Sequence, residues 1–403
     1  MKKIPIWTSC LLLAAWVCLP ASVRATSLFS MVFLGERVER GDARSIALGG
    51  SSQLLPDTLA AMSTNTALLS RLNRTTVSAS QVIAFDTGSS VNYEERDISA
   101  SFPGIMLAMP IRHFFTLSIG YKGRYDPDGS FAVPGTSSAG DTYRTQFTKS
   151  GGLWSIPIGL SFNLTRFLEI GGTISLERGF IQERWDIIFD ASGFAPSAGF
   201  KKEEFDAQSY SVSGILNLGS RIMIGGIWES EIDYDTFIQE RYSQATLDTS
   251  YKSVVKLPAR LTVQATAQIT RRILVAASAT VSDFSEFVGL EFPAQRLDRG
   301  EAFAVGLEYG RLFRLPWRIG FSYEKLPYQH PGIASAEPAD VRRILFSIGS
   351  GVNIFGGRGK LDLAVQFGRQ GSRDDNGIQD RMIRFYIGAN GSEAWRRKGT
   401  APF

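Results

Sequence analysis

The sequence has 403 residues, of which 44% are hydrophobic, and it carries 43 basic and 39 acidic residues, for a formal net charge of +4 at pH 7. Three of the basic residues and none of the acidic ones precede position 26, so residues 26–403 hold 40 basic and 39 acidic residues. This balance gives no reason to expect a nucleic-acid partner, and we predict none. The two cysteines, Cys10 and Cys18, also precede position 26, which excludes disulfides and thiolate sites from the rest of the chain.

The first residues have the pattern of a secretory signal. A pair of lysines precedes an apolar run from Ile4 to about Pro20, and small residues follow up to Ala25. The run is short for a membrane-spanning helix. We therefore predict a cleaved signal peptide over residues 1–25 and export of the rest of the chain. An uncleaved anchor and a lipid-attachment signal at Cys18 are the alternatives.

Apolar and polar residues alternate from about residue 74 onward. In one such segment, for example, Leu261 and Val263 alternate with Thr262 and Gln264. Successive side chains of a strand point to opposite faces, so each of these segments has one apolar and one polar face. A soluble β-sandwich would produce the same alternation. No second apolar run reaches the length of a membrane-spanning helix.

The lengths of the connections favour a membrane barrel over a sandwich. We count about 14 alternating segments, at 74–85, 96–109, 113–125, 152–164, 166–190, 203–218, 221–241, 247–269, 272–289, 300–311, 315–326, 341–354, 359–370 and 378–391. Brief connections follow the even-numbered segments, whereas longer polar stretches, such as 126–151, follow most odd-numbered ones. Outer-membrane barrels have an even number of strands, with short turns at one end and long loops at the other.

We therefore predict an all-β fold, a transmembrane antiparallel β-barrel of about 14 strands over residues 74–397 with a short tail at 398–403. A sheet in hydrocarbon has to close, because each backbone N–H and C=O needs a hydrogen-bonding partner there. The predicted location is a bacterial outer membrane, in which the chain is integral.

Residues 26–73, ahead of the predicted barrel, lack sustained alternation. An Ala/Leu-rich stretch from Leu59 to Leu72 favours a short helix. The segment is too short for a confident independent domain and too apolar for a flexible tail. We predict a small N-terminal hatch, or plug, folded inside the barrel lumen. A periplasmic extension is the alternative.

Part of this segment resembles the hatch of the FadL-type outer-membrane transporters of long-chain fatty acids and aromatic hydrocarbons. The matching positions are Gly49, Gly50, Asp57, Asn65, Thr66 and Ala67, and Thr66 stands where the family typically has proline. The resemblance implies a passive channel for hydrophobic small molecules. Related PorV-like barrels share the hatch, so a non-transporting barrel that serves secretion, assembly or attachment is the alternative. As partners we expect a hydrophobic ligand, membrane lipid or lipopolysaccharide, and the barrel-assembly machinery.

Proline and glycine interrupt the second predicted strand at Phe102, Pro103 and Gly104. Proline has no amide hydrogen to donate to a β-ladder, and glycine often marks a bulge. In the resembled family, a kinked strand near the hatch opens a lateral exit through the wall. These three residues are therefore the candidate exit, and a bulge without a passage is the alternative.

No set of side chains indicates an enzyme. The only histidines are His113 and His330, in a predicted turn and a predicted loop. A serine triad or a histidine metal centre would need partners from distant loops. We therefore expect no catalytic residues, no metal and no cofactor.

Charged residues of both signs fall on the predicted inner face of the barrel. The candidate lumen-lining residues are Arg260, Glu308, Arg318, Glu324, Arg343, Asp362 and Arg384. Selective pores tend to present rings of one sign. The mixed signs therefore predict ion pairs that brace a plugged lumen.

Overall fold

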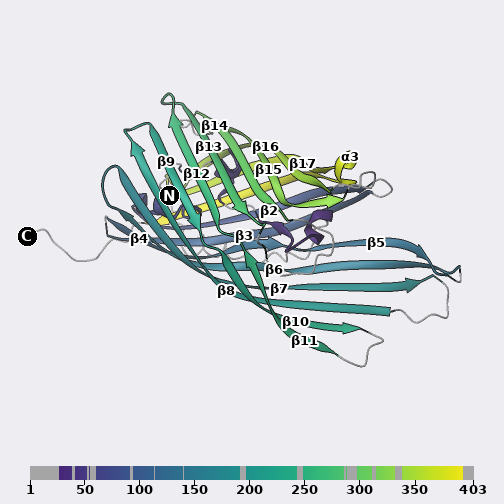
Figure 1. Ribbon diagram of the computed structural model, residues 1–403. Helices are drawn as coiled ribbons and strands as arrows, with labels where there is room; N and C mark the ends of the chain where they lie inside the picture. The colour runs from purple at the N-terminus through teal and green to yellow at the C-terminus, as the bar shows by residue number, and fades with distance from the viewer. Residues whose placement is uncertain are drawn as a thin grey trace, which may run out of the picture.

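The computed structural model describes residues 27–38, 41–51, 54, 60–90, 94–112, 114–138, 140–190, 197–242, 248–285, 287, 297–310, 315–331 and 338–393. Within these ranges, no helix has the length and apolar character needed to cross a membrane. Antiparallel strands make up most of the described chain (Figure 1).

The strands of the wall follow one another in sequence order around one sheet. They are β2 (Thr75–Ser90), β3 (Glu94–Arg112), β4 (Phe115–Asp126), β5 (Gly129–Thr136), β6 (Thr142–Asn163), β7 (Leu168–Phe189), β8 (Ser197–Leu218), β9 (Ile222–Glu229), β10 (Ile232–Tyr242), β11 (Thr249–Leu257), β12 (Arg260–Gln268), β13 (Ile273–Asp283), β14 (Arg299–Tyr309), β15 (Trp317–Pro331), β16 (Pro338–Ile354), β17 (Gly359–Ser372) and β18 (Ile378–Glu393). The other elements are the 3-10 helices η1 (Leu28–Met31) and η2 (Thr66–Arg71), the short strand β1 (Glu36–Arg37), and the helices α2 (Ala43–Ala47) and α3 (Arg373–Asn376).

The sheet closes on itself because the last strand pairs with the first wall strand along its whole length, from Ile378↔Ser90 to Glu393↔Thr75. Three wall strands are each interrupted once and continue as a second element, namely β4/β5, β9/β10 and β11/β12. The predicted closed antiparallel barrel of 14 strands is confirmed.

The two faces of the wall differ as the alternation predicts. On the outer face, Val263 and Ile319 are 50% and 56% exposed. Their neighbours Gln264 and Arg318 point inward and are each 2% exposed. A continuous belt of exposed apolar side chains suits the hydrocarbon of a membrane, and a soluble monomer rarely exposes so large an apolar surface.

The wall is much taller on one side. β6, β7 and β8 each have 22 residues, and with β5, β10 and β11 they form a sheet that extends beyond the other strands at the long-loop end (Figure 1). The predicted loop at 126–151 was therefore wrong, because β5 and the first half of β6 form a hairpin there. Phe131 and Phe147 are directly opposite each other, with ring centroids 5.0 Å apart, and such cross-strand aromatic pairs stabilise a hairpin.

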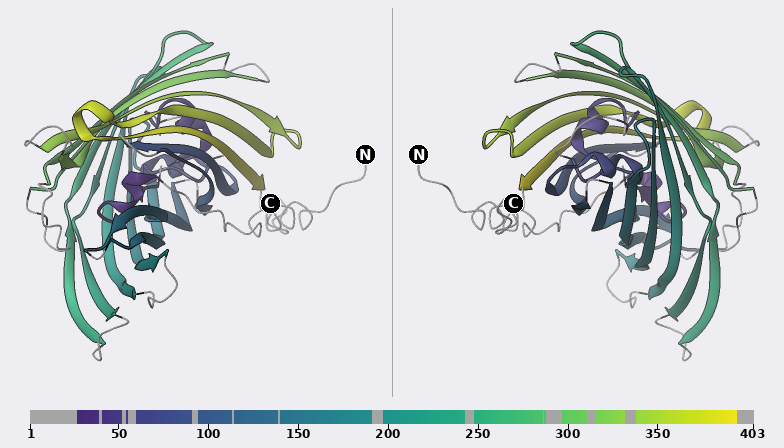
Figure 2. Two further views of the ribbon diagram at one scale, coloured as in Figure 1. Left: turned by 90° about the vertical axis from the view of Figure 1, so that its right-hand side faces the viewer. Right: turned by 90° about the vertical axis from the view of Figure 1, so that its left-hand side faces the viewer.

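The described N-terminal elements lie within the curve of the wall strands (Figure 2). α2 contacts β15 to β18, and η2 contacts β4, β6, β7 and β8. Two wall glycines allow the closest approaches. A Cβ atom at Gly320 would lie 2.0 Å from the backbone nitrogen of Gly49, and one at Gly306 would lie 2.5 Å from the carbonyl oxygen of Leu48.

Candidate functional site

A buried chain of charges joins α2 to the wall. Arg44 contacts Glu308 through two hydrogen bonds of 2.7 and 2.8 Å. Arg318 contacts Glu308 and Asp362, each at 2.8 Å. Glu308 and Arg318 face inward together because they are directly opposite each other on β14 and β15. The side chains of all four residues are at most 5% exposed, so each charge depends on its neighbours for compensation.

α2 begins at an acidic N-cap. The Asp42 carboxylate accepts a hydrogen bond from the backbone N–H of Ser45 at 2.9 Å, which satisfies one of the free amides of the first turn. Burial raises the pKa of Asp42 above its ordinary value, and the nearby Asp362 carboxylate raises it further. The helix is thus anchored by Arg44, whereas burial disfavours the charged form of its cap residue, Asp42.

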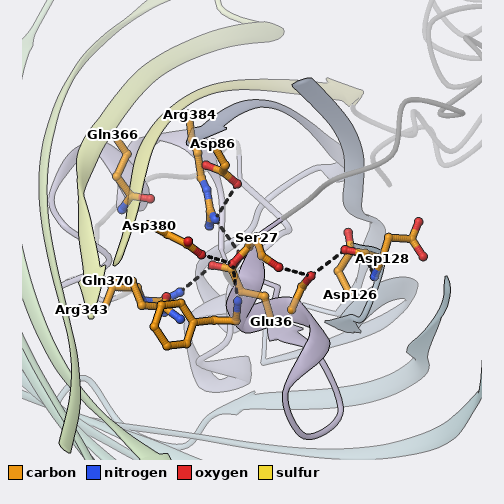
Figure 3. Close-up of polar contacts among 12 residues, drawn as sticks. Ser27, Glu36, Asp86, Asp126, Asp128, Arg343, Gln366, Gln370, Asp380 and Arg384 are labelled. Atoms are coloured by element: carbon orange, nitrogen blue, oxygen red, sulfur yellow. Dashed lines mark hydrogen bonds and ion pairs between the residues drawn. The ribbon is translucent and has the colours of Figure 1, made fainter. Parts of the chain in front are cut away.

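A second cluster surrounds Glu36 of β1 (Figure 3). The Glu36 carboxylate accepts hydrogen bonds from Arg343 at 2.9 Å and from Arg384 at 2.7 Å. Arg384 also contacts Asp86 at 3.3 Å, and Arg343 also pairs with Glu324. Burial raises the pKa of Glu36, but the two arginines outweigh that effect and leave the pKa below its ordinary value. β1 is therefore held by charges from β16 and β18, the two strands that flank β17.

Four residues that form ion pairs inside the barrel were not among the predicted site residues. They are Arg44, Arg71, Glu36 and Asp86. Arg71 of η2 binds Glu169 of β7 at 2.8 Å, and the partners lie 98 residues apart. Arg44 and Glu308 lie 264 residues apart. The basic residues of α2 and η2 were the available signal, but their partners could not be read from the sequence.

The described residues of the predicted hatch motif follow the C-terminal end of α2 or lie at the start of η2. Gly49 and Gly50 have φ angles of 75° and 72°, the left-handed region that ends a helix. The Asn65 side chain accepts from the Ala67 N–H at 3.2 Å, and the Thr66 hydroxyl is 2.7 Å from that of a wall threonine, Thr173. Asp57 lies outside the described residues.

The barrel wall parts between β3 and β4 at the predicted kink. The two strands are paired only from Gly104↔Lys122 to the short-turn end, so the rest of β3, from Glu94 to Pro103, has no partner on β4. On the other side of β3, a bulge places Phe102 and Pro103 opposite a single residue of β2. The free end of β4 pairs with β1 instead. The kink, the parted strands and the N-terminal segment therefore meet at one place.

Three cavities lie near this opening. A cavity of about 50 Å³ is lined by Ser99, Ser101 and Pro103 of β3 together with residues of β1, β2, β4 and β18. A larger cavity of about 170 Å³ has mainly polar walls, and a third of about 60 Å³ lies beside it. Arg260 lines both of these, and its buried Nε atom has no hydrogen-bonding partner among the described residues. The part of the lumen around Arg260 is therefore polar.

An apolar cluster lies near the protruding sheet. Its buried members are Phe33, Leu34, Leu153, Ile181, Phe205, Ala207, Ile232, Tyr234, Val255, Leu257 and Phe284. Phe33 packs its ring against those of Phe284 and Phe287, with centroids 5.9 and 4.9 Å away. Its φ of 58° lies in the left-handed region, at a cost on the order of 1–3 kcal/mol. Lys149 donates to the Phe33 carbonyl at 2.7 Å and helps to hold this backbone conformation.

No family model and no curated protein sequence matches the chain. Solved structures do match it. A FadL homologue from Pseudomonas aeruginosa has a TM-score of 0.60 at 12% identity, over 88% of this chain and 99% of that one. The toluene transporter TodX from Pseudomonas putida has a TM-score of 0.56 at 14% identity, over 89% and 100%. The toluene transporter TbuX from Ralstonia pickettii has a TM-score of 0.54 at 14% identity, over 88% and 99%.

These similarities extend over nearly the whole length of each matched structure. They agree with the closed antiparallel barrel described above. The chain therefore has the fold of the FadL-type outer-membrane transporters.

Proposed function

We propose that the protein is a passive outer-membrane channel for hydrophobic small molecules, of the size and character of long-chain fatty acids or aromatic hydrocarbons. The observation that carries the proposal is the parting of β3 from β4 beside the N-terminal segment. Unpaired backbone groups are costly in hydrocarbon, so we interpret the ten residues of β3 that have no partner on β4, 94–103, as one side of an opening beside the N-terminal segment.

The proposed route begins at the apolar cluster around Phe33. An apolar molecule gains about 25 cal/mol for each Å² that it removes from water, so it would bind among these side chains first. The polar lumen around Arg260 and the ion-paired Arg318 offers it no comparable environment. The opening beside Gly104 leads instead toward the hydrocarbon, and the described part of the segment 26–73 acts as the hatch that directs the molecule sideways.

Similar solved structures agree with this assignment at the level of fold. Two of them are described as toluene transporters. That description belongs to those proteins, and its extension to this chain is part of the proposal.

A reversible covalent tether across the opening tests the route. Residues after position 25 include no cysteine, so Ser101→Cys on β3 and Gly123→Cys on β4 can be joined by a thiol-specific cross-linker. The matched control joins Ala108→Cys to Ser118→Cys, which are already directly opposite each other below the opening. Uptake of labelled oleate and toluene is measured in a deletion strain that carries each variant.

We expect the tether across the opening to abolish uptake, reduction of the tether to restore it, and the control to transport like the unmodified chain. Unchanged uptake through the tethered opening would refute the lateral route. If the deletion strain itself takes up both compounds normally, the channel function is refuted. A stoichiometric protein partner recovered with the tagged barrel would then favour the alternative role in secretion, assembly or attachment.

A further inference from the structure

Two arginines face each other on the outer surface of the wall. Arg369 of β17 and Arg381 of β18 are directly opposite in the ladder, and both side chains are exposed. Directly opposite residues of an antiparallel pair have Cα atoms about 5 Å apart, and like charges there are destabilising. The closed barrel nevertheless brings them together.

The same surface carries two further exposed arginines. Arg381 lies opposite Thr87 of β2, and Thr87 lies opposite Arg96 of β3, so the row continues across the seam of the barrel. Arg342 of β16 is diagonal to Arg369, because its outward neighbour Ile344 is the residue directly opposite Arg369. We call Arg96, Arg342, Arg369 and Arg381 the outer arginine patch.

The protein itself supplies little negative charge to this patch. Arg96 pairs with Glu94 at 3.2 Å, and both side chains are at least half exposed. Among the described residues, no carboxylate lies within ion-pair distance of Arg342, Arg369 or Arg381. The nearby helix α3 has two exposed acidic residues, Asp374 and Asp375, but neither pairs with the patch.

Two outward-facing arginines of β7 have acidic partners. Arg178 of β7 pairs with Asp206 at 2.6 Å, and Arg184 pairs with Asp186 at 2.9 Å. The lack of acidic partners therefore distinguishes Arg342, Arg369 and Arg381 from the arginines of β7.

Exposed apolar side chains lie directly beneath the patch, two residues along each strand. They are Phe367, Ile383, Phe85 and Ile98, with exposures of 43%, 48%, 40% and 50%. The patch thus marks the upper edge of the apolar belt, on the side of the long loops, which in outer-membrane barrels faces the exterior. A molecule that matches both the arginine patch and the apolar side chains beneath it has an anionic headgroup attached to several acyl chains.

We propose that the outer arginine patch binds the phosphorylated headgroup of a multiply acylated glycolipid of the outer leaflet, of the lipopolysaccharide type. Arginine forms bidentate, charge-assisted hydrogen bonds with phosphate oxygens, so a phosphate placed between Arg369 and Arg381 relieves their repulsion. The acyl chains lie along Phe367 and Ile383. This inference does not depend on the proposed channel function.

The test compares two double variants of the full chain, purified in detergent and freed of native lipid. R369Q/R381Q removes the opposed pair, whereas R178Q/R184Q removes two outward arginines that have acidic partners. The probes are diphosphorylated lipid A, the same lipid with both phosphates removed, and inorganic phosphate. Binding is measured by native mass spectrometry, and a gel-migration difference between heated and unheated samples verifies that each variant is folded.

We expect R369Q/R381Q to bind diphosphorylated lipid A about tenfold more weakly or worse, and R178Q/R184Q to bind like the unmodified chain. The unmodified chain should prefer the diphosphorylated lipid to the dephosphorylated one and should not retain inorganic phosphate. Equal binding by R369Q/R381Q, or equal losses in both variants, would overturn the proposal. So would equal binding of the dephosphorylated lipid, which would show that acyl chains alone suffice, or retention of inorganic phosphate in place of the lipid.

Discussion

Arg318 bridges two acidic residues in a part of the lumen that water scarcely reaches. Its guanidinium contacts Glu308 and Asp362, and all three side chains are at most 1% exposed. A buried ion pair adds little net stability compared with an apolar pair, because both charges lose their hydration. Removing one partner is a different matter, since it leaves an uncompensated charge in a low-dielectric site.

We therefore predict that Arg318→Leu lowers the free energy of unfolding by about 3–5 kcal/mol. The exposed pair Arg178–Asp206 serves as the control, and Arg178→Leu should cost no more than about 1 kcal/mol. Denaturant unfolding of both variants in detergent, followed by tryptophan fluorescence, measures the difference. Equal effects of the two substitutions would contradict the burial argument.

Two carboxylates of the N-terminal segment should respond to pH in opposite directions. The pKa of Glu36 is lowered in the folded chain, so its stabilising effect is present above the ordinary value of 4.5 and is lost as the pH falls through the folded value. The pKa of Asp42 is raised, so its protonated form favours folding and stability decreases as the pH rises from the ordinary value of 3.8 through the folded value.

Unfolding free energies of Glu36→Gln and Asp42→Asn, measured against the unmodified chain from pH 3 to pH 7, check both signs. The deficit of Glu36→Gln should be largest near pH 7 and should shrink on acidification. Asp42→Asn should gain stability relative to the unmodified chain as the pH rises. If the unfolding free energies of the two variants changed with pH in the same direction relative to the unmodified chain, the opposite pKa shifts of Glu36 and Asp42 would be refuted.

At the scale of elements, α2 keeps its place because wall glycines leave room for its backbone. Gly320→Val would place a Cβ atom 2.0 Å from the Gly49 nitrogen, and neither backbone can yield without moving the helix. We predict faster amide hydrogen exchange over residues 43–50 in this variant, with the barrel strands unchanged. Gly391→Ala on β18 is the control, because no atom lies within 4 Å of the added methyl group. Unchanged exchange in Gly320→Val would mean that α2 is not held by this contact.

The alternation of apolar and polar residues predicted some strands well and missed others. The predicted segment at 359–370 corresponds to β17 (Gly359–Ser372), because the period of two is a local property of the chain. The hairpin of β5 and β6 was missed because Pro134 and Gly135 resemble loop residues. Proline is tolerated there because β5 is paired on one side only, with β6, which leaves its other edge free.

At the scale of the whole molecule, the closure of the sheet into a barrel determines its resistance to unfolding. The seam between β2 and β18 pairs 16 residues of each strand, so the described wall has no long free edge there. Such a barrel should resist dodecyl sulfate at room temperature and unfold only on heating. We predict different gel migration for unheated and boiled samples, and identical migration would argue strongly against a closed barrel.

The sequence by itself determined the fold class, the approximate number of strands and which side chains face inward, because all three follow from a pattern that each strand carries locally. It also indicated that the inner charges are of both signs. Only the tertiary structure decided which charges meet. Arg44 and Glu308 are 264 residues apart, and their contact depends on the register of the strands and the path of the N-terminal segment inside the barrel. The opposition of Arg369 and Arg381 and the parting of β3 from β4 likewise follow from register, which is fixed by the closed sheet as a whole.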